Sequence, residues 1–104
     1  MPKKSNKDKL LGFLDENIFN PILEASEEDY SEDEKGDLIE MKESSAKEKE
    51  KYHGLKTAEE IKNQFQSDIE TEDQMMDDRL DKLNLPKLSD VEDEFSNLCE
   101  EMNI

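Results

Sequence analysis

The sequence is poor in the residues that build β-sheets, tight turns and covalent cross-links. It has one valine, three glycines, three prolines and no tryptophan in 104 residues, whereas leucine, glutamate and lysine are frequent. So little valine and turn material argues against a sheet, and the frequent residues are good helix formers. The single cysteine, Cys99, excludes an internal disulfide framework and suits a reducing compartment. These scarcities together predict an all-α protein.

Long apolar runs are also missing. No stretch approaches the 18 or so apolar residues that a membrane-spanning helix needs. The lysine-rich start of the chain leads into an amphipathic segment with Asp15 and Glu16, which differs from the uninterrupted apolar core of a signal peptide. These early lysines are Lys3, Lys4, Lys7 and Lys9. We therefore expect a cytoplasmic protein with no membrane contact.

The composition is dominated by negative charge. Thirty acidic residues face 14 basic ones, which gives a net charge of −16. Leucine, isoleucine, valine and phenylalanine together supply 22 of the 104 residues, just above the fraction of about 20% below which highly charged chains stay disordered. We therefore predict a disordered basic tail over residues 1–7 and a single domain over residues 8–104. This domain would be a bundle of four to five short helices around a thin core.

The most amphipathic segment is the last one. Its apolar residues recur at spacings of 3, 4, 3 and 4, which places them on one face of a helix. They are Leu88, Val91, Phe95, Leu98 and Met102. Ser89 and Glu92 have the spacing of a capping box, and Pro86 separates this helix from the preceding one. We expect the other helices to pack against this stripe.

The first half of the chain predicts two helices around an acidic loop. A first helix is expected over residues 8–19, followed either by a restart at Asn20-Pro21 or by a kinked continuation. Residues 24–37 are almost entirely acidic and are predicted to form a loop. Ser31 and Glu34 have the spacing of a capping box for a helix that runs to about Tyr52.

Residues 57–84 contain two more capping-box patterns, which begin at Thr57 and Thr71. The apolar stripes that follow them nearly align, so one long helix is the alternative, but the acidic residues after Thr71 favour two helices. Met75 and Met76 are predicted to lie in the core, with a partner surface as the less favoured interpretation.

Two patterns invite a metal interpretation. Glu50 and His53 have the Glu-x-x-His spacing of di-metal bundles, but such a site needs a second pair and this chain has one histidine. The acidic segment also places carboxylates or hydroxyls at positions 1, 3, 5 and 12 of a calcium-binding loop, while Glu34 stands where glycine is required. Those residues are Asp29, Ser31, Asp33 and Glu40. We expect neither site to bind a metal.

Catalytic patterns find no support either. The sequence has no glycine-rich phosphate loop and no turn that would present a nucleophilic serine. Cys99 and the distant His53 are the only thiol and imidazole, and Cys99 is expected to be an inert core thiol. We therefore predict a protein that is not an enzyme and takes no cofactor. Direct binding to nucleic acid is not expected, because the net charge repels phosphates.

The acidic surface is the remaining candidate for function. The leading hypothesis is a small regulatory or binding module whose carboxylates engage a basic partner protein, with nucleic-acid mimicry as a narrower version. The carboxylates proposed to face the partner are Glu27, Glu28, Asp29, Glu32 and Asp33. The alternative is a structural protein that forms homo-oligomers through its C-terminal helix, although two heptads are short for a coiled coil.

Overall fold

The computed structural model describes residues 5–71 and 74–104, and the regular structure in these ranges is helical. This confirms the predicted all-α class. The α-helices are α1 (Asn6–Leu14), α2 (Asn20–Leu23), α3 (Glu32–His53), α4 (Ala58–Glu70), α5 (Gln74–Lys82) and α6 (Glu92–Glu101). A π-helical turn over Asp15–Phe19 joins α1 to α2, and two 3₁₀ turns cover Glu27–Asp29 and Leu88–Val91. Among the described helices, none combines the length and apolar character needed to cross a bilayer.

The first helical segment is continuous from α1 through the π turn to α2. Pro21 has no N–H to donate, so the helix loses a backbone hydrogen bond there, and the N–H of Asn20 bonds to the carbonyl of Asp15. The chain therefore continues as helix through Pro21, as the alternative expected, and the restart is wrong. Ser5 Oγ accepts from the N–H of Asp8 at 3.1 Å and caps α1. The predicted tail thus reaches too far at residues 5–7, and its residues 1–4 lie outside the described ranges.

The predicted cap of α3 is confirmed. The N–H and the hydroxyl of Ser31 both donate to Glu34 Oε1, at 3.3 and 2.8 Å, and the helix begins at Glu32. The acidic loop is therefore shorter than predicted, because residues 32–37 are helical. Carboxylates in a first turn are stabilised by the positive end of the helix dipole, so an acidic run at this place favours helix rather than loop.

Two separate helices, α4 and α5, confirm the predicted division of residues 57–84. Thr57 Oγ1 accepts from the N–H of Glu60 at 3.1 Å, while the Glu60 carboxylate accepts from the N–H of Lys56 at 2.8 Å. Thr71 instead ends α4, and its hydroxyl donates to the carbonyl of Ser67 at 2.8 Å. The rest of the box predicted at Thr71 involves residues 72 and 73, which lie outside the described ranges.

The start of the last helix differs from the prediction. Residues 88–91 form a 3₁₀ turn that is closed by Asp90, whose carboxylate accepts from the N–H of Lys87 at 3.2 Å, and Ser89 makes no cap. A 3₁₀ turn advances by about 120° per residue instead of 100°, so the predicted apolar stripe loses its phase. Phe95 and Cys99 are therefore the buried residues of α6. The others lie at the edge of the core: Leu88, Val91, Leu98 and Met102.

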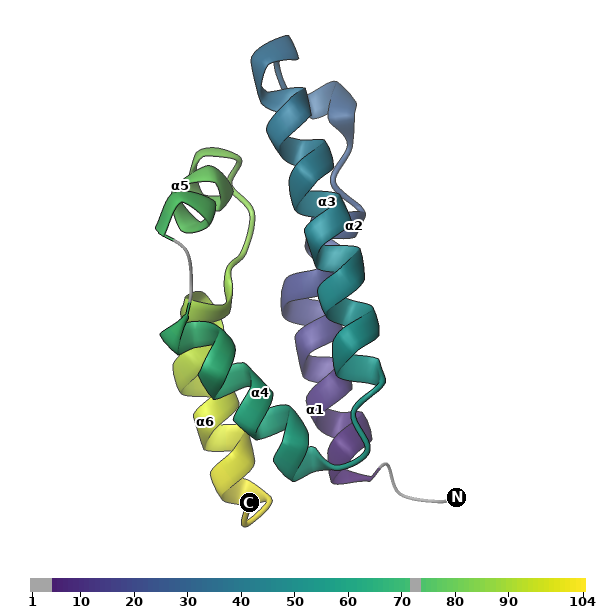
Figure 1. Ribbon diagram of the computed structural model, residues 1–104, viewed down its shortest axis with the longest axis vertical. Helices are drawn as coiled ribbons and strands as arrows, with labels where there is room; N and C mark the ends of the chain where they lie inside the picture. The colour runs from purple at the N-terminus through teal and green to yellow at the C-terminus, as the bar shows by residue number, and fades with distance from the viewer. Residues whose placement is uncertain (1–4, 72–73) are drawn as a thin grey trace.

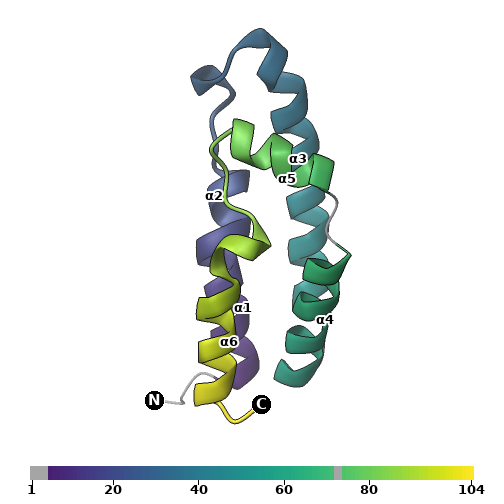
Figure 2. The same cartoon turned by 90° about the vertical axis from the view of Figure 1, so that its left-hand side faces the viewer.

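The helices form two layers, α1, α2 and α3 in one, and α4, α5 and α6 in the other (Figures 1 and 2). The first helical segment supplies the largest share of the buried apolar side chains, namely Leu10, Leu11, Leu14, Ile18, Phe19 and Ile22. Phe95 of α6 stacks on Phe65 of α4 at a centroid distance of 4.0 Å and lies 6.1 Å from Phe13 of α1. The first helical segment is therefore the central element of the core, and α6 packs against α1 and α4 through Phe95.

Candidate functional site

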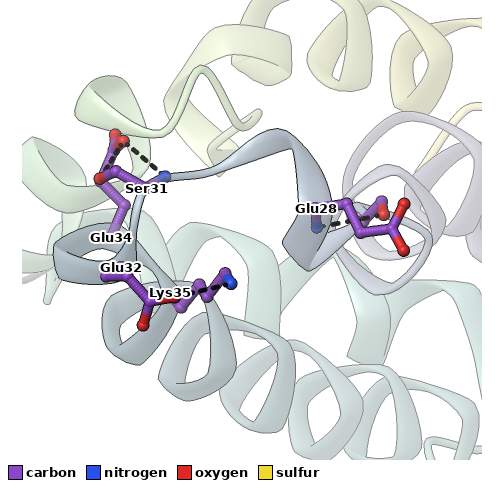
Figure 3. Close-up of polar contacts among 6 residues, drawn as sticks. Glu28, Ser31, Glu32, Glu34 and Lys35 are labelled. Carbon is purple, nitrogen blue, oxygen red and sulfur yellow. Dashed lines mark hydrogen bonds and ion pairs between the residues drawn. The ribbon is translucent and has the colours of Figure 1, made fainter.

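The five carboxylates predicted to face a partner lie together at one end of the molecule, where the loop after α2 meets the start of α3 (Figure 1). We call this group the acidic tip: Glu27, Glu28, Asp29, Glu32 and Asp33. All five side chains are exposed. The 3₁₀ turn presents the first three, and it is held by Ser26, whose hydroxyl accepts from the N–H of Glu28 at 3.4 Å (Figure 3).

Few positive charges compensate the tip. Within the described part of the chain, its one ion pair joins Glu32 to Lys35 at 3.3 Å, and both side chains are exposed enough for this pair to contribute little (Figure 3). Glu34 lies beside the tip and belongs to the cap of α3, because it accepts hydrogen bonds from Ser31. These hydrogen bonds hold the pKa of the Glu34 carboxyl below the usual value. The dipole of α3 accounts for acids in its first turn, but not for the carboxylates of the 3₁₀ turn.

Contacts with the second layer hold the tip in place. The hydroxyl of Tyr30 donates to the carbonyl of Leu83 at 2.8 Å. Further along α3, Glu40 pairs with Arg79 of α5 at 2.8 Å, and Asp37 lies 4.0 Å from the same guanidinium. These two acids therefore act within the fold, whereas the tip carboxylates other than Glu32 make no ion pair in the described part of the chain.

A second polar group joins the layers further down α3. The hydroxyl of Tyr52 donates to Asp68 of α4 at 2.6 Å, Gln64 donates to the same carboxylate at 2.8 Å, and Lys51 lies 3.6 Å away. Burial raises the pKa of Tyr52 far above its usual value, and its hydrogen bond to Asp68 acts in the same direction. This group was not predicted, although Gln64 and Asp68 share a helix face at i,i+4 spacing.

Glu48 lies beside this group and is incompletely paired. Its side chain is 40% exposed, yet its Oε2 atom is buried and has no hydrogen-bond partner. Its other carboxylate oxygen lies 3.9 Å from Lys51. Burial raises the pKa of Glu48, the negative charge of Asp68 adds to this effect, and Lys51 opposes it. A buried acceptor without a donor is costly, so this oxygen is a candidate for a ligand contact.

Glu48 and Asp68 line a cleft between the two layers, which we call the interlayer cleft. Its volume is about 370 Å³, within the usual range of ligand pockets. The π turn and α2 supply one apolar wall, α3 supplies a second, and α5 with residues 86–88 closes the other side. Its apolar lining residues are Ile18, Phe19, Ile22, Met41, Met76, Leu80, Pro86 and Leu88.

The methionines predicted to lie in the core are exposed instead. Met75 is 66% exposed and Met76 is 37% exposed, and Met76 lines the interlayer cleft. The helix α5 is short and buries Leu80, with Leu83 just after its end, so its first turn stands away from the core. The core interpretation is therefore wrong, and the partner-surface interpretation stays a prediction, since surface methionines are adaptable contact residues.

The residues considered as metal ligands are used or placed differently. His53 Nε2 lies 2.8 Å from Asp15 Oδ2 and 3.0 Å from Oδ1, and so ties the end of α3 to the π turn. Glu50 is exposed. The segment with calcium-loop spacing is helical from Glu32 onward, so it cannot wrap around an ion. Across residues 5–71 and 74–104, no cluster of three or more potential ligands has the geometry of a metal site.

Cys99 is buried between α4 and α6 and borders a groove of about 320 Å³. Burial raises the pKa of its thiol, and the nearby Lys62 offsets only part of this. A thiol with a raised pKa is protonated at neutral pH and is a poor nucleophile. This geometry is the one expected of an unreactive core cysteine.

We compared the chain with protein-family models, with curated proteins and with solved structures, and none of the three gave a match. Any function assigned to this chain therefore has to come from its own residues.

Proposed function

We propose that this chain is a small acidic α-helical binding module that engages a basic partner protein through the acidic tip. The observation that carries this proposal is the placement of five exposed carboxylates within residues 27–33, with one half-buried lysine paired to Glu32. The contacts of Tyr30 and Arg79 hold this end of the molecule in place. A partner would therefore meet a preformed negative surface.

Electrostatic attraction of this kind acts mainly on the association rate. A net charge of −16 attracts a basic protein over a distance set by the Debye length, which is about 8 Å at physiological ionic strength. The association rate should therefore fall as salt rises, and specificity has to come from apolar contacts close to the tip. Nucleic-acid mimicry is a narrower form of this proposal that rests on charge alone.

Self-association through α6 gains no support from the geometry. Phe95 is 2% exposed and stacks on Phe65 within the same chain, and Cys99 is equally buried. The central residues of the stripe are therefore occupied inside the bundle. A second copy would meet only its half-buried edge.

The experiment that tests the proposal neutralises the acidic tip. The five carboxylates are changed to the matching amides, and a control variant carries the same change at five exposed carboxylates on α6. The control residues are Glu92, Asp93, Glu94, Glu100 and Glu101. Both variants include residues of a first helical turn, so their effects on helix stability are comparable.

Each protein is then used to capture partners from native extract at low and at high salt, with mass spectrometry as the readout. We expect one basic protein that elutes as salt rises, is lost from the tip variant and is retained by the control, while circular dichroism stays unchanged. Equal capture by the two variants would contradict the role of the tip.

A further inference from the structure

The interlayer cleft has the features of a site for an apolar side chain. Its walls come from both layers, and the π turn places Ile18 and Phe19 along one side. Turns of this kind are rare and occur frequently at functional sites. Met76, whose side chain is flexible, lies at the edge of the cleft and is partly exposed. The cleft thus combines a preformed apolar surface with an adaptable rim.

Glu48 gives this apolar cleft an acceptor that needs a donor. Its Oε2 atom is buried and accepts no hydrogen bond within the described chain, while Asp68, which also lines the cleft, has its own donors already in place. The last torsion of a glutamate side chain is soft, so a small rotation turns this oxygen toward an incoming group. A cationic donor forms the strongest hydrogen bond with such a carboxylate.

We propose that the interlayer cleft receives an apolar side chain and a neighbouring lysine or arginine from a helix of the basic partner, with Glu48 accepting the cation. This inference rests on the proposed function and supplies the specific contact that the acidic tip lacks. A helix presents side chains at i and i+3 or i+4 on one face, which is the spacing needed to place an anchor and a cation in one cleft.

The charges around the cleft are compatible with a cation. Lys87 also lines it, but its ammonium is held by Asp81 at 2.7 Å. The other lining lysine, Lys47, is exposed to solvent, and Asp77 adds a negative charge from α5. With Glu48, Asp68 and Asp77 against Lys47 and Lys87, the lining carries more acid than base.

The first step of the test uses a defined probe. A short amphipathic helical peptide of leucine and lysine is titrated into the isotopically labelled full-length protein, with a peptide of the same composition and a scrambled pattern as control. We expect NMR shift changes at Ile18, Met41 and Leu80, and weaker binding of the scrambled peptide. Shift changes confined to the acidic tip would overturn the inference.

The second step uses matched variants. We expect Glu48→Gln to weaken peptide binding about tenfold, because it removes the charge of the acceptor. The control, Glu50→Gln on the exposed face of α3, should change the affinity for the peptide less than about twofold. Ser44 also lines the cleft, so Ser44→Phe should block the peptide by filling the space. Equal effects of Glu48→Gln and Glu50→Gln would overturn the role of Glu48.

The tip variant separates this inference from the proposed function. If neutralising the acidic tip weakens peptide binding but Glu48→Gln and Ser44→Phe leave the affinity unchanged, the cleft inference is overturned and the proposed function stands. If neither the tip variant nor the cleft variants weaken peptide binding, both proposals are contradicted. If both kinds of variant weaken peptide binding, the result supports the cleft as the specific contact and the tip as the electrostatic one.

Discussion

The hydrogen bond from Tyr52 to Asp68 offers a sharp test of how the two layers are joined. The side chain of Tyr52 is fully buried, its hydroxyl donates to Asp68 Oδ2 at 2.6 Å, and its ring lies 5.7 Å from that of Phe19. Burial raises the pKa of the phenol above its usual value, so the hydroxyl is protonated and donates at neutral pH. Tyr52→Phe keeps the ring and removes this donor alone.

The magnitude follows from the partners that remain. A hydrogen bond to a charged group contributes about 1.5–3 kcal/mol to stability. Asp68 keeps Gln64 at 2.8 Å and Lys51 at 3.6 Å after the substitution, so it is not left unpaired. We therefore expect Tyr52→Phe to lower the free energy of unfolding by about 1.5 kcal/mol, the lower end of this range. For a domain of this size, such a loss lowers the melting temperature by roughly 6–10 °C.

The assay is thermal and urea unfolding followed by circular dichroism. Tyr30→Phe is the matched control, because it also removes one hydroxyl, but this hydroxyl donates to the neutral carbonyl of Leu83. The control should cost about 0.5–1 kcal/mol. Equal losses for the two variants, or a full loss for Tyr52→Phe in an Asp68→Ala background, would refute the idea that a charge-assisted bond joins α3 to α4.

Three further outcomes are expected. Glu48→Gln should raise the melting temperature at pH 7, and this gain should disappear toward pH 4. The pKa of Glu48 in the folded state lies above the usual 4.5, so the stability of the original protein falls as pH rises and this carboxyl ionises in the folded protein. The glutamine variant does not ionise and escapes this loss. An unchanged pH profile would count against a raised pKa. Phe95→Asp should unfold the monomer, since it places a charge in the core at a cost of at least about 3 kcal/mol, and dissociation of a folded oligomer would instead favour self-assembly. Ser31→Ala should cost about 1 kcal/mol in urea unfolding through the cap of α3, whereas Ser89→Ala should cost almost nothing.

Local structure was largely predictable because its causes are local. The caps at Ser31 and Thr57 need only a hydroxyl and a following glutamate at fixed spacing, and both are present. The all-α class follows from composition, and α4 ends at Glu70 within the region where the sequence predicted a division. The exposure of the acidic tip could be expected from its lack of apolar neighbours.

The tertiary structure decided how these helices are used. Ser45 is buried on α3, where it lines the interlayer cleft, while the more apolar Ile39 is exposed, so hydropathy alone does not give the face that α3 buries. The pairing of Tyr52 with Asp68 and the burial of the unpaired oxygen of Glu48 join residues from different helices. No periodicity within one segment encodes such contacts, since each depends on where a second segment lies in space.

The sequence by itself therefore determined the helical segments, the caps at Ser31 and Thr57 and the exposed acidic residues, since propensity, capping and charge act within a few residues of each other. Only the tertiary structure decided that the first helical segment forms the centre of the core and that the layers enclose a cleft. Both depend on packing between residues far apart in the chain, which side-chain volume and burial settle collectively.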